Sequence, residues 1–236
     1  MSQTSKKKNV DVINAGVIGY PIHHSKSPLI QNYFINTHNL NAVYKKYEIK
    51  DEVELKSFTH RVLNGNWAGF NITIPHKQTI IPFLNTIDED VKCIGACNTV
   101  VIKNNQMHGY NTDAEGFYYP IRNENISSAM ILGNGGASRA VLYQLCKEGI
   151  SDICVVARNH DSSIDFIAEL NNLYDKNIQQ YSFLDVTQQK ELLHNHQLVV
   201  NTTSVGMSND DPPFEFISNL TQKHIFYDLI YNPWET

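Results

Sequence analysis

Polar side chains gather at the ends of three segments that are typical of strands in the first half of the chain. Asn71 and Thr73 alternate with apolar residues, so they point to one face of a strand that Pro75 ends, and Lys77 follows this stop. Amides, hydroxyls and one carboxylate stand at the other two strand ends: Asn98, Thr99, Asn111, Thr112 and Asp113. Singly, each residue is typical of an ordinary turn. Together they favour a site for a polyhydroxylated, acidic small molecule beside a nicotinamide.

Two serines are spaced for a second part of this site. Ser25 and Ser27 stand two residues apart between a predicted strand and a predicted helix. Hydroxyls and free backbone N–H groups in such a turn can bind a carboxylate. Pro28 follows Ser27, which is the pattern of an N-cap residue with proline at the first helical position. Helix capping therefore explains Ser27 by itself and leaves only Ser25 without a structural role.

A glycine-rich turn in the second half joins a predicted strand to a predicted helix. Gly133 permits the tight turn, and Gly135 lets the backbone approach a pyrophosphate, which the free N–H groups of the helix would hold. No Gly-Lys-Ser/Thr ending follows, so the turn is not a nucleoside-triphosphate loop. Ser138 occupies the place of the usual third glycine. A plain strand–helix turn is the alternative, but the strand–loop–helix context favours dinucleotide binding.

The next predicted strand, residues 153–157, ends at Arg158 and Asn159. Sites that prefer NAD usually carry an acid here, which accepts a hydrogen bond from the ribose 2′-hydroxyl, whereas an arginine suits a 2′-phosphate. This position therefore predicts a preference for NADP. An exposed arginine that contacts no ligand is the alternative that the sequence leaves open.

Strands and helices alternate along almost the whole chain and carry these motifs. Predicted strands cover residues 10–18, 42–49, 70–74, 129–132, 153–157, 197–201 and 225–229, and a hairpin covers 98–103 and 107–110. Predicted helices begin at Ser27 and Asp51 and cover 136–148 and 165–174; the first carries Leu29, Ile30, Tyr33, Phe34 and Thr37 at helical spacing. Such alternation indicates α/β architecture with parallel sheets. The pattern restarts after Asp113, so we expect two α/β domains, 1–111 and 112–236, with a boundary within 111–125 and a cleft between them.

Composition excludes several classes of protein. The chain has 236 residues, 42% of them hydrophobic, and a net charge of −5, so it can bury a sizeable core and is not a generally basic nucleic-acid-binding protein. The lysine run at 6–8 is typical of a solvated tail. No apolar run reaches membrane-spanning length, and no signal-peptide core follows the lysines. Four cysteines without zinc-site spacing indicate free thiols in a cytoplasmic protein, and the isolated histidines indicate no metal site.

Seven segments, in this order, resemble the shikimate dehydrogenase family. They are Gly19–Pro28, Asn71–Lys77, Gly95–Thr99, Gly109–Asp113, Gly133–Ala140, Asn201–Met207 and Asp228–Pro233, and the resemblance runs from about residue 15 to residue 236. It implies a reversible, NADPH-dependent reduction of 3-dehydroshikimate to shikimate, a step in aromatic amino acid synthesis, without a metal. It also implies an N-terminal α/β domain that binds the substrate and a C-terminal Rossmann-like domain that binds NADP.

The resemblance also implies roles for individual residues. Lys77 would be the general acid and base, paired with Asp113, while Ser25 and Ser27 would hold the substrate carboxylate. The substrate ring and its hydroxyls would contact Asn71, Thr73, Asn98, Asp113 and Tyr231, and the cofactor site would be lined by Gly133, Asn134, Gly135, Gly136, Ala137, Arg158, Asn159, Leu229 and Glu89. The chemistry agrees, because hydride arriving at a ketone carbon makes an alkoxide that needs a proton and a nearby positive charge, and a lysine ammonium supplies both.

The chain departs from the family pattern at several positions. Gln31 replaces a usual histidine, and Cys97 replaces a small aliphatic residue, both of which are tolerable changes. Ala157 and Asn159 replace the residues that usually flank the cofactor arginine. Arg158 is thus left alone, which predicts a weaker preference for NADP.

The last departure lies at the end of the sequence. The family continues past Tyr231-Asn232-Pro233 into a helix that contributes a substrate-binding glutamine, whereas this sequence stops at Thr236. Either a truncated record or an impaired protein is therefore expected.

Two other functions stay open beside shikimate dehydrogenase. Quinate dehydrogenases share the scaffold, but the serine pair favours shikimate, because a serine-to-threonine change in that motif commonly accompanies quinate use. A ligand-binding homologue with weak or no turnover is the second alternative, and the retained Lys77 and Asp113 argue against it. The expected partner is shikimate or 3-dehydroshikimate, with no nucleic acid and no membrane, in a monomer or a homodimer.

Overall fold

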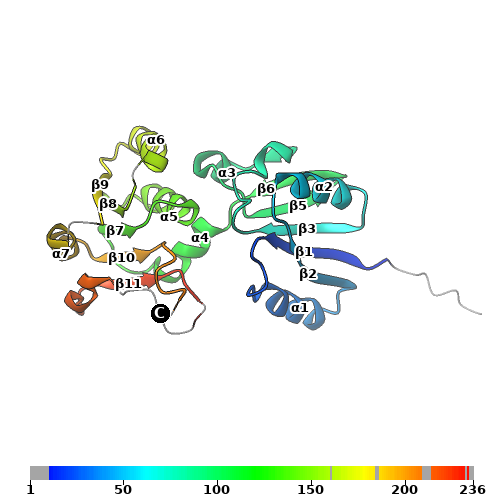
Figure 1. The fold of residues 1–236 in the computed structure, drawn as a ribbon, viewed down its shortest axis with the longest axis horizontal. Coiled ribbons are helices and arrows are strands. Elements are labelled where there is room, and N and C mark those ends of the chain that lie inside the picture. The colour runs from blue at the N-terminus through cyan, green and yellow to red at the C-terminus, as the bar shows by residue number, and fades with distance from the viewer. Residues whose placement is uncertain (1–10, 160, 184–185, 209–213, 232, 234–236) are drawn as a thin grey trace, which may run out of the picture. The chain divides into compact units, whose positions relative to one another are not determined.

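The computed structural model describes residues 11–159, 161–183, 186–208, 214–231 and 233. The chain divides into two compact units, Met1–Thr112 and Asp113–Thr236, and each is built on its own sheet (Figure 1). The lysine run at 6–8 and Val10, predicted as a tail and a strand start, lie outside the described residues, as do Asn232 and Thr236.

A six-stranded mixed sheet forms the centre of the first unit. Its strands are β1 (Ile13–Gly19), β2 (Ala42–Glu48), β3 (Trp67–Ile72), β4 (Thr86–Ile87), β5 (Thr99–Lys103) and β6 (Gln106–Tyr110), in the order β2-β1-β3-β5-β6-β4. β1 is parallel to both β2 and β3, and β4 is parallel to β6. β5 is antiparallel to both of its neighbours, β3 and β6. The predicted hairpin is confirmed, with Asn104 and Asn105 at positive φ in its two-residue turn. The expectation of parallel sheets is wrong for this unit, because the hairpin reverses the chain.

The first unit has helices α1 (Ser27–Thr37), α2 (Glu52–Leu63) and α3 (Glu89–Ile94), and a 3₁₀ turn at Ile81–Phe83. α2 begins after Asp51, whose side chain accepts a hydrogen bond from the Glu54 N–H at 2.9 Å. Buried residues of α2 pack against one face of the sheet, in a core that includes Leu55, Phe58, Val62, Ile18, Phe70 and Ile72. The alternate face of β1 and β2 carries Val17 and Tyr44, which pack with Ile35 of α1.

Helix α1 differs from its prediction at its N-terminus. Its N-cap is Lys26 rather than the predicted Ser27, and the Ser27 N–H instead donates to Ser25 Oγ at 3.3 Å. Ser25 therefore has a structural role at the helix start. Apart from Ile35, which packs on the sheet, the apolar residues of α1 lie largely in solvent: no residue of this helix is fully buried, and Leu29 is 75% exposed. Helical spacing gives side chains a common face but does not determine what covers it.

The second unit is built on a wholly parallel sheet, as the strand–helix alternation predicts. Its strands are β7 (Ser128–Leu132), β8 (Asp152–Ala157), β9 (Gln179–Ser182), β10 (Leu198–Asn201) and β11 (Ile225–Asp228), in the order β11-β10-β7-β8-β9. The order reverses between β7 and β10. In such sheets, ligands bind at this reversal, outside the carboxyl ends of the strands.

The helices of the second unit are α4 (Asp113–Tyr118), α5 (Gly136–Lys147), α6 (Ile164–Tyr174) and α7 (Val186–Asn195), with 3₁₀ turns at Tyr119–Ile121, Asp161–Ser163 and Glu215–Asn219. α5 packs on β7 and contacts both α4 and α6 (Figure 1). Leu192 and Leu193 of α7 pack with Met130 and Leu132 of β7 in a separate core. This arrangement is Rossmann-like, as predicted.

Five elements fall outside the sequence prediction: β4, β9, α3, α4 and α7. β4 has two residues, and β9 has the sequence Gln-Gln-Tyr-Ser, which lacks apolar alternation. α3 and α4 have six residues each, too few to display a helical period. Tertiary contacts rather than local pattern therefore determine these short elements.

Candidate functional site

A network of polar side chains joins the ends of β3 and β5 in the first unit. Asn71 of β3 donates from Nδ2 to Thr99 Oγ1 at 3.0 Å, and its Oδ1 accepts a hydrogen bond from the Tyr44 hydroxyl at 2.7 Å. Thr99 in turn donates to Asn98 Oδ1 at 2.9 Å. Asn71 and Asn98, both predicted to contact substrate, are thus linked through Thr99. Tyr44 is absent from the sequence prediction, because a tyrosine on a strand is typical of a core.

Asn98 also fixes the chain that leads to Asp113. Its side chain is only 7% exposed, its Oδ1 accepts the Thr112 N–H at 3.0 Å, and its Nδ2 donates to Thr112 Oγ1 at 3.1 Å. Asn111 is buried and donates to the Ala96 carbonyl at 2.9 Å, so it has a structural role. Asp113 follows directly as the first residue of α4. The backbone just before this carboxylate is therefore held at the strand end that carries Asn98.

The serine pair lies at the start of α1, with both hydroxyls together. Ser25 Oγ donates to Ser27 Oγ at 3.2 Å, and Ser25 is buried. Asn32 ties this helix to the sheet: its Nδ2 donates to the Tyr44 carbonyl at 2.9 Å, and its Oδ1 accepts the Tyr44 N–H at 3.0 Å. The side-chain amide of Asn32 thus takes the place of a neighbouring strand along this part of β2.

Lys77 lies in the turn that follows β3. Its carbonyl accepts the Cys97 N–H at 2.7 Å, which holds its backbone beside the residue that precedes Asn98. The neighbouring His76 is buried, and its Nε2 lies 2.7 Å from the Ile49 carbonyl, so this imidazole points into the core. Thr73 is half-buried and donates its N–H to the Ile18 carbonyl at 2.9 Å. Of His76 and Lys77, only Lys77 keeps a half-exposed side chain.

The glycine turn lies at the carboxyl end of β7, where the strand order reverses. Gly133 has φ +97°, and a Cβ there would lie 2.9 Å from Thr202 Oγ1, so glycine is required. Thr202, which follows β10, bonds the Leu132 carbonyl through both its N–H (3.0 Å) and its hydroxyl (2.6 Å). The Gly133 N–H donates to the Val156 carbonyl of β8 at 2.8 Å. These bonds fix the turn at the meeting point of three strands.

The start of α5 has the features that a pyrophosphate needs. Gly135 is its N-cap and supplies no side chain, and a Cβ at Gly135 or Gly136 would meet no atom within 4 Å. The first N–H groups of the helix therefore face open space at its positive end. Ser138 Oγ is buried and has no hydrogen-bond partner among the described residues. The open backbone cradle at the glycines fits a dinucleotide, whereas the fully buried Ser138 hydroxyl does not face it.

The loop after β8 is joined to this turn. Asn134 donates from Nδ2 to the Asn159 carbonyl and to Ser163 Oγ, the latter at 3.1 Å. Arg158, which precedes Asn159, has an exposed side chain. Arg139, in the first half of α5, instead stacks its guanidinium over the Phe166 ring at 3.9 Å. The second unit thus brings Gly133, Asn134, Gly135, Gly136, Ala137, Arg158 and Asn159 to one edge of its sheet.

The remaining predicted residues lie at three places. Leu229 follows β11 at the same edge, and its N–H donates to the Asn201 carbonyl at 3.2 Å. Tyr231 is 55% exposed two residues later. Glu89 begins α3 in the first unit and pairs with Lys92 Nζ at 2.9 Å. Asp228, absent from the prediction, accepts from Asn201 Nδ2 at 3.1 Å and from the Ile230 N–H at 2.9 Å, and so shapes the backbone around Leu229.

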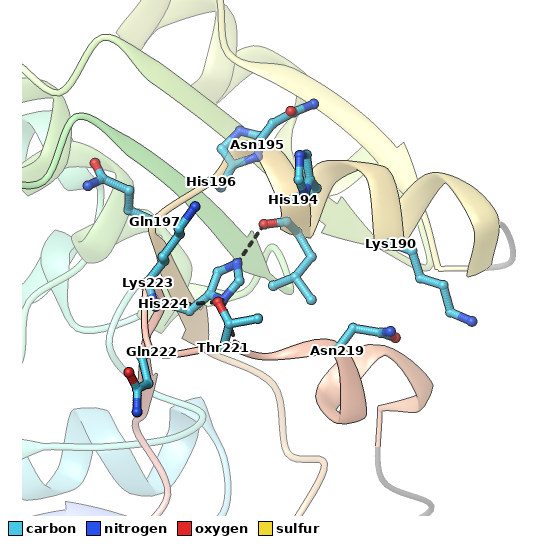
Figure 2. A pocket seen from close by; sticks show the side chains of 11 residues that line it. Lys190, His194, Asn195, His196, Gln197, Asn219, Thr221, Gln222, Lys223 and His224 are labelled. Carbon is cyan, nitrogen blue, oxygen red and sulfur yellow. Dashed lines mark hydrogen bonds between the residues drawn. The ribbon is translucent and has the colours of Figure 1, made fainter.

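A pocket of about 750 Å³ lies at the opposite edge of this sheet, next to the residues that precede β10 and β11 (Figure 2). The Thr221 N–H donates to His224 Nδ1 at 2.9 Å, so His224 Nε2 carries the proton and donates to the Leu193 carbonyl at 3.0 Å. His196 Nδ1 lies 2.6 Å from the Leu192 carbonyl. Both imidazoles therefore cap the last turn of α7. The pocket lies away from the glycine turn and has no part in the site.

Several classes of site find no support in the described part of the chain. No group of three or more His, Cys, Asp or Glu side chains there is arranged to hold a metal ion. All four cysteines are free thiols. Over the same residues, no helix has the length and apolarity that crossing a bilayer requires.

Comparison with known proteins decides the family. Residues 17–100 match the model of the shikimate dehydrogenase substrate binding domain. A shikimate dehydrogenase (NADP(+)) of Methanosphaera stadtmanae is 36% identical over 230 residues, which cover 94% of this chain and 79% of the relative. The chain belongs to the shikimate dehydrogenase family. The match to the domain model includes Ser25, Ser27, Asn71, Thr73, Lys77 and Asn98.

Solved structures of the family have the same fold. The shikimate dehydrogenase of Aquifex aeolicus is 35% identical, with a TM-score of 0.84 over 94% of this chain and 80% of that one. A quinate dehydrogenase of Corynebacterium glutamicum, solved with NAD, is 26% identical, with a TM-score of 0.83 over 94% and 81%. The fold is therefore common to both activities.

Proposed function

We propose that this chain catalyses the reversible, NADPH-dependent reduction of 3-dehydroshikimate to shikimate in aromatic amino acid synthesis. The observation that carries the proposal is its similarity, over nearly its whole length, to curated shikimate dehydrogenases (NADP(+)). Two features of the chain support it. The strand ends of the first unit carry a network of amides and hydroxyls, and the second unit has an open glycine turn at its carboxyl edge.

Each unit has its own part in this proposal. The first unit, residues 1–111 with a boundary within 111–125, binds the substrate. The hydroxyls of Ser25 and Ser27 donate hydrogen bonds to the substrate carboxylate. The ring and its hydroxyls contact Asn71, Thr73, Asn98, Asp113 and Tyr231. The second unit, to residue 236, binds NADP through residues 133–137, Arg158, Asn159 and Leu229, with Glu89 as a further contact. The match of the substrate-domain model to residues 17–100 supports the first role.

Proton transfer is the step that the chain itself performs. When bound, NADPH supplies a hydride to the ketone carbon. Lys77 donates a proton from Nζ to the oxygen of that ketone, and its positive charge lowers the energy of the developing alkoxide. Asp113 orients the ammonium group and favours its charged form. In the direction of oxidation, Lys77 accepts the hydroxyl proton.

Product identification tests this proposal against the quinate alternative. The purified chain is incubated with NADPH and either 3-dehydroshikimate or 3-dehydroquinate, and the products are separated by chromatography. We expect shikimate from the first substrate and little product from the second. Quinate as the main product would reassign the chain to quinate dehydrogenase. The same incubation with NADH measures the cofactor preference.

We also propose a cytoplasmic location and a monomer or homodimer as the assembly. Four free thiols and the use of NADPH support the location. Sedimentation equilibrium distinguishes the two assembly states. A larger oligomer would contradict this part of the proposal.

A further inference from the structure

The hydrogen bonds around Asn71 have directions that can be followed from one backbone group. The Thr112 N–H can only donate, and it donates to the side chain of Asn98 at 3.0 Å, so the atom facing it is Oδ1. Thr99 then donates its hydroxyl hydrogen to this oxygen at 2.9 Å. Since the Thr99 hydrogen is used in this bond, Thr99 Oγ1 accepts from Asn71, and the Asn71 atom 3.0 Å away is Nδ2.

It follows that Asn71 turns its oxygen towards Tyr44. The Tyr44 hydroxyl lies 2.7 Å from Asn71 Oδ1 and donates to it. Tyr44 is 5% exposed, and burial raises the pKa of its hydroxyl above its usual value, so the phenol is a donor near neutral pH. Reversal of the Asn71 amide would set its oxygen against Thr99 Oγ1, whose hydrogen is already used, and would set its NH₂ group against the Tyr44 hydroxyl.

The backbone of Tyr44 is itself fixed from the other side. Asn32 of α1 bonds both the N–H and the carbonyl of Tyr44, at 3.0 and 2.9 Å. Its Nδ2 also donates to the Pro28 carbonyl at 2.8 Å, one residue after Ser27. A continuous series of contacts therefore runs from the serine pair through Asn32 and Tyr44 to Asn71.

We propose that Tyr44 is a positioning residue, which holds the Asn71 amide in the one orientation that binds the substrate ring. This inference rests on the proposed function, because it assigns Asn71 to substrate. With both Nδ2 hydrogens directed at Thr99 Oγ1 and the Asn98 carbonyl (3.4 Å), Asn71 offers the ligand a lone pair of Oδ1. Asn71 therefore recognises a hydroxyl donor of the ring rather than a carbonyl.

Calorimetric titration of shikimate into Tyr44→Phe tests the inference. Loss of the donor removes the bond that holds Asn71 Oδ1 and leaves the amide held only through Nδ2, so we expect the dissociation constant for shikimate to rise about 5- to 30-fold. The turnover number at saturating shikimate should change less than about twofold, because Lys77 and Asp113 are untouched. Tyr47→Phe is the matched control: it removes a hydroxyl from the same strand on the other face, where Tyr47 packs on Phe58 and Trp67. This control should bind shikimate as the wild type does.

A double-mutant cycle separates positioning from a general loss of structure. If Tyr44 acts through Asn71, then adding Tyr44→Phe to Asn71→Ala changes the dissociation constant less than about twofold. Full additivity of the two substitutions would overturn the inference, as would a lower melting temperature with unchanged affinity in Tyr44→Phe. Thr99→Val breaks the same series from its other end and gives a second test if Tyr44→Phe does not fold. Wild-type protein that binds no shikimate would overturn the proposed function, and this inference with it.

Discussion

Asn71 and Lys77 lie close in the chain, Asn71 in β3 and Lys77 in the turn that follows this strand. Asn71 has its amide held by Tyr44 and Thr99, at 2.7 and 3.0 Å. Lys77 has its backbone fixed by Cys97 while its side chain is half-exposed. A group that binds profits from being fixed, whereas a group that moves a proton needs access to the reacting oxygen.

Replacement of Lys77 tests the proton transfer. Lys77→Ala should lower kcat about 10²- to 10⁴-fold, which is the usual contribution of a general acid or base. Affinity for shikimate should change little, because the serine pair still holds the carboxylate. Lys77→Arg should not restore kcat, since a guanidinium does not release its proton near neutral pH. Steady-state shikimate oxidation, followed by NADPH absorbance, gives kcat, and near wild-type turnover in Lys77→Ala would remove this lysine from the mechanism.

Arg158 tests the cofactor preference. An arginine at a 2′-phosphate makes a charge-assisted contact, so Arg158→Ala should weaken NADPH binding roughly 10- to 100-fold and leave NADH binding unchanged. Arg122→Ala is a suitable control, because this exposed arginine stacks on Tyr119 at 4.1 Å. Fluorescence titration with both cofactors measures the change. Equal affinity for NADPH and NADH, unaltered in Arg158→Ala, would place the discrimination elsewhere.

Some residues of the site could be predicted from the sequence, and others could not. Residue type and strand position predicted that Asn71 and Asn98 lie at neighbouring strand ends and that a glycine turn follows β7, and the structure has both features. Tyr44 and Asn32 could not be predicted, because their roles depend on a hydroxyl and an amide reaching residues 27 and 12 positions away in the chain. The sequence assigned helix capping to Ser27 and no structural role to Ser25. The N-cap is instead Lys26, which makes no side-chain cap bond, and Ser25 is the serine that accepts a backbone N–H there.

At the scale of elements, α1 and α2 show what a helical period does and does not determine. Both repeat apolar residues at helical spacing, but only α2 buries them: Leu55 is fully buried, whereas Leu29 of α1 is 75% exposed. α1 is held to β2 in large part through polar bonds, those of Asn32 among them. Apolar spacing predicted α1, and Asp51 predicted the start of α2, but burial depends on what packs against each face.

This contrast gives a stability prediction. Leu55→Ala should lower the free energy of unfolding by about 2–5 kcal/mol, because it leaves a cavity in the core of the first unit. Leu29→Ala should change it by less than about 0.5 kcal/mol, because this side chain is mostly solvated. Urea unfolding followed by circular dichroism measures both variants. A loss of several kcal/mol in Leu29→Ala would show that another part of the protein covers α1.

The four cysteine thiols of the molecule are divided between its two units. Cys97 lies in the core of the first unit, and Cys146 and Cys154 are buried in the second, whereas Cys93 is half-buried. Burial raises the pKa of Cys146 to about 11 and also raises that of Cys154. A thiol is protonated below its pKa, and the thiolate is the reactive form, so a raised pKa makes these thiols slow to react near neutral pH.

Reaction with a disulfide reagent near neutral pH should therefore have a single fast phase, from Cys93. The three buried thiols should react only as their unit opens, and faster as urea is added. Cys93→Ser should abolish the fast phase without changing the slow ones. Rapid reaction of a second thiol in native protein would contradict the packing of the unit that contains it.

The restart of the strand–helix pattern predicted the parallel second sheet. The first sheet is mixed because β5 pairs antiparallel with β3, which the strand–helix pattern does not predict. A hairpin is a local feature that the sequence displays, through Asn104 and Asn105. Its insertion between β3 and the short β4 depends on contacts distant in sequence. Strand order is therefore the part of the fold that local pattern could not supply.

The proposed function requires that this chain oxidise shikimate with NADP⁺ by means of its own residues. The most direct measurement is NADPH formation by the wild-type chain with saturating shikimate and NADP⁺, next to calorimetric binding of each ligand to the same preparation. We predict turnover that requires both ligands, is much lower with quinate, and is lower with NAD⁺. Binding of shikimate and NADP⁺ without formation of NADPH would contradict the claim and would identify a ligand-binding homologue instead of an enzyme.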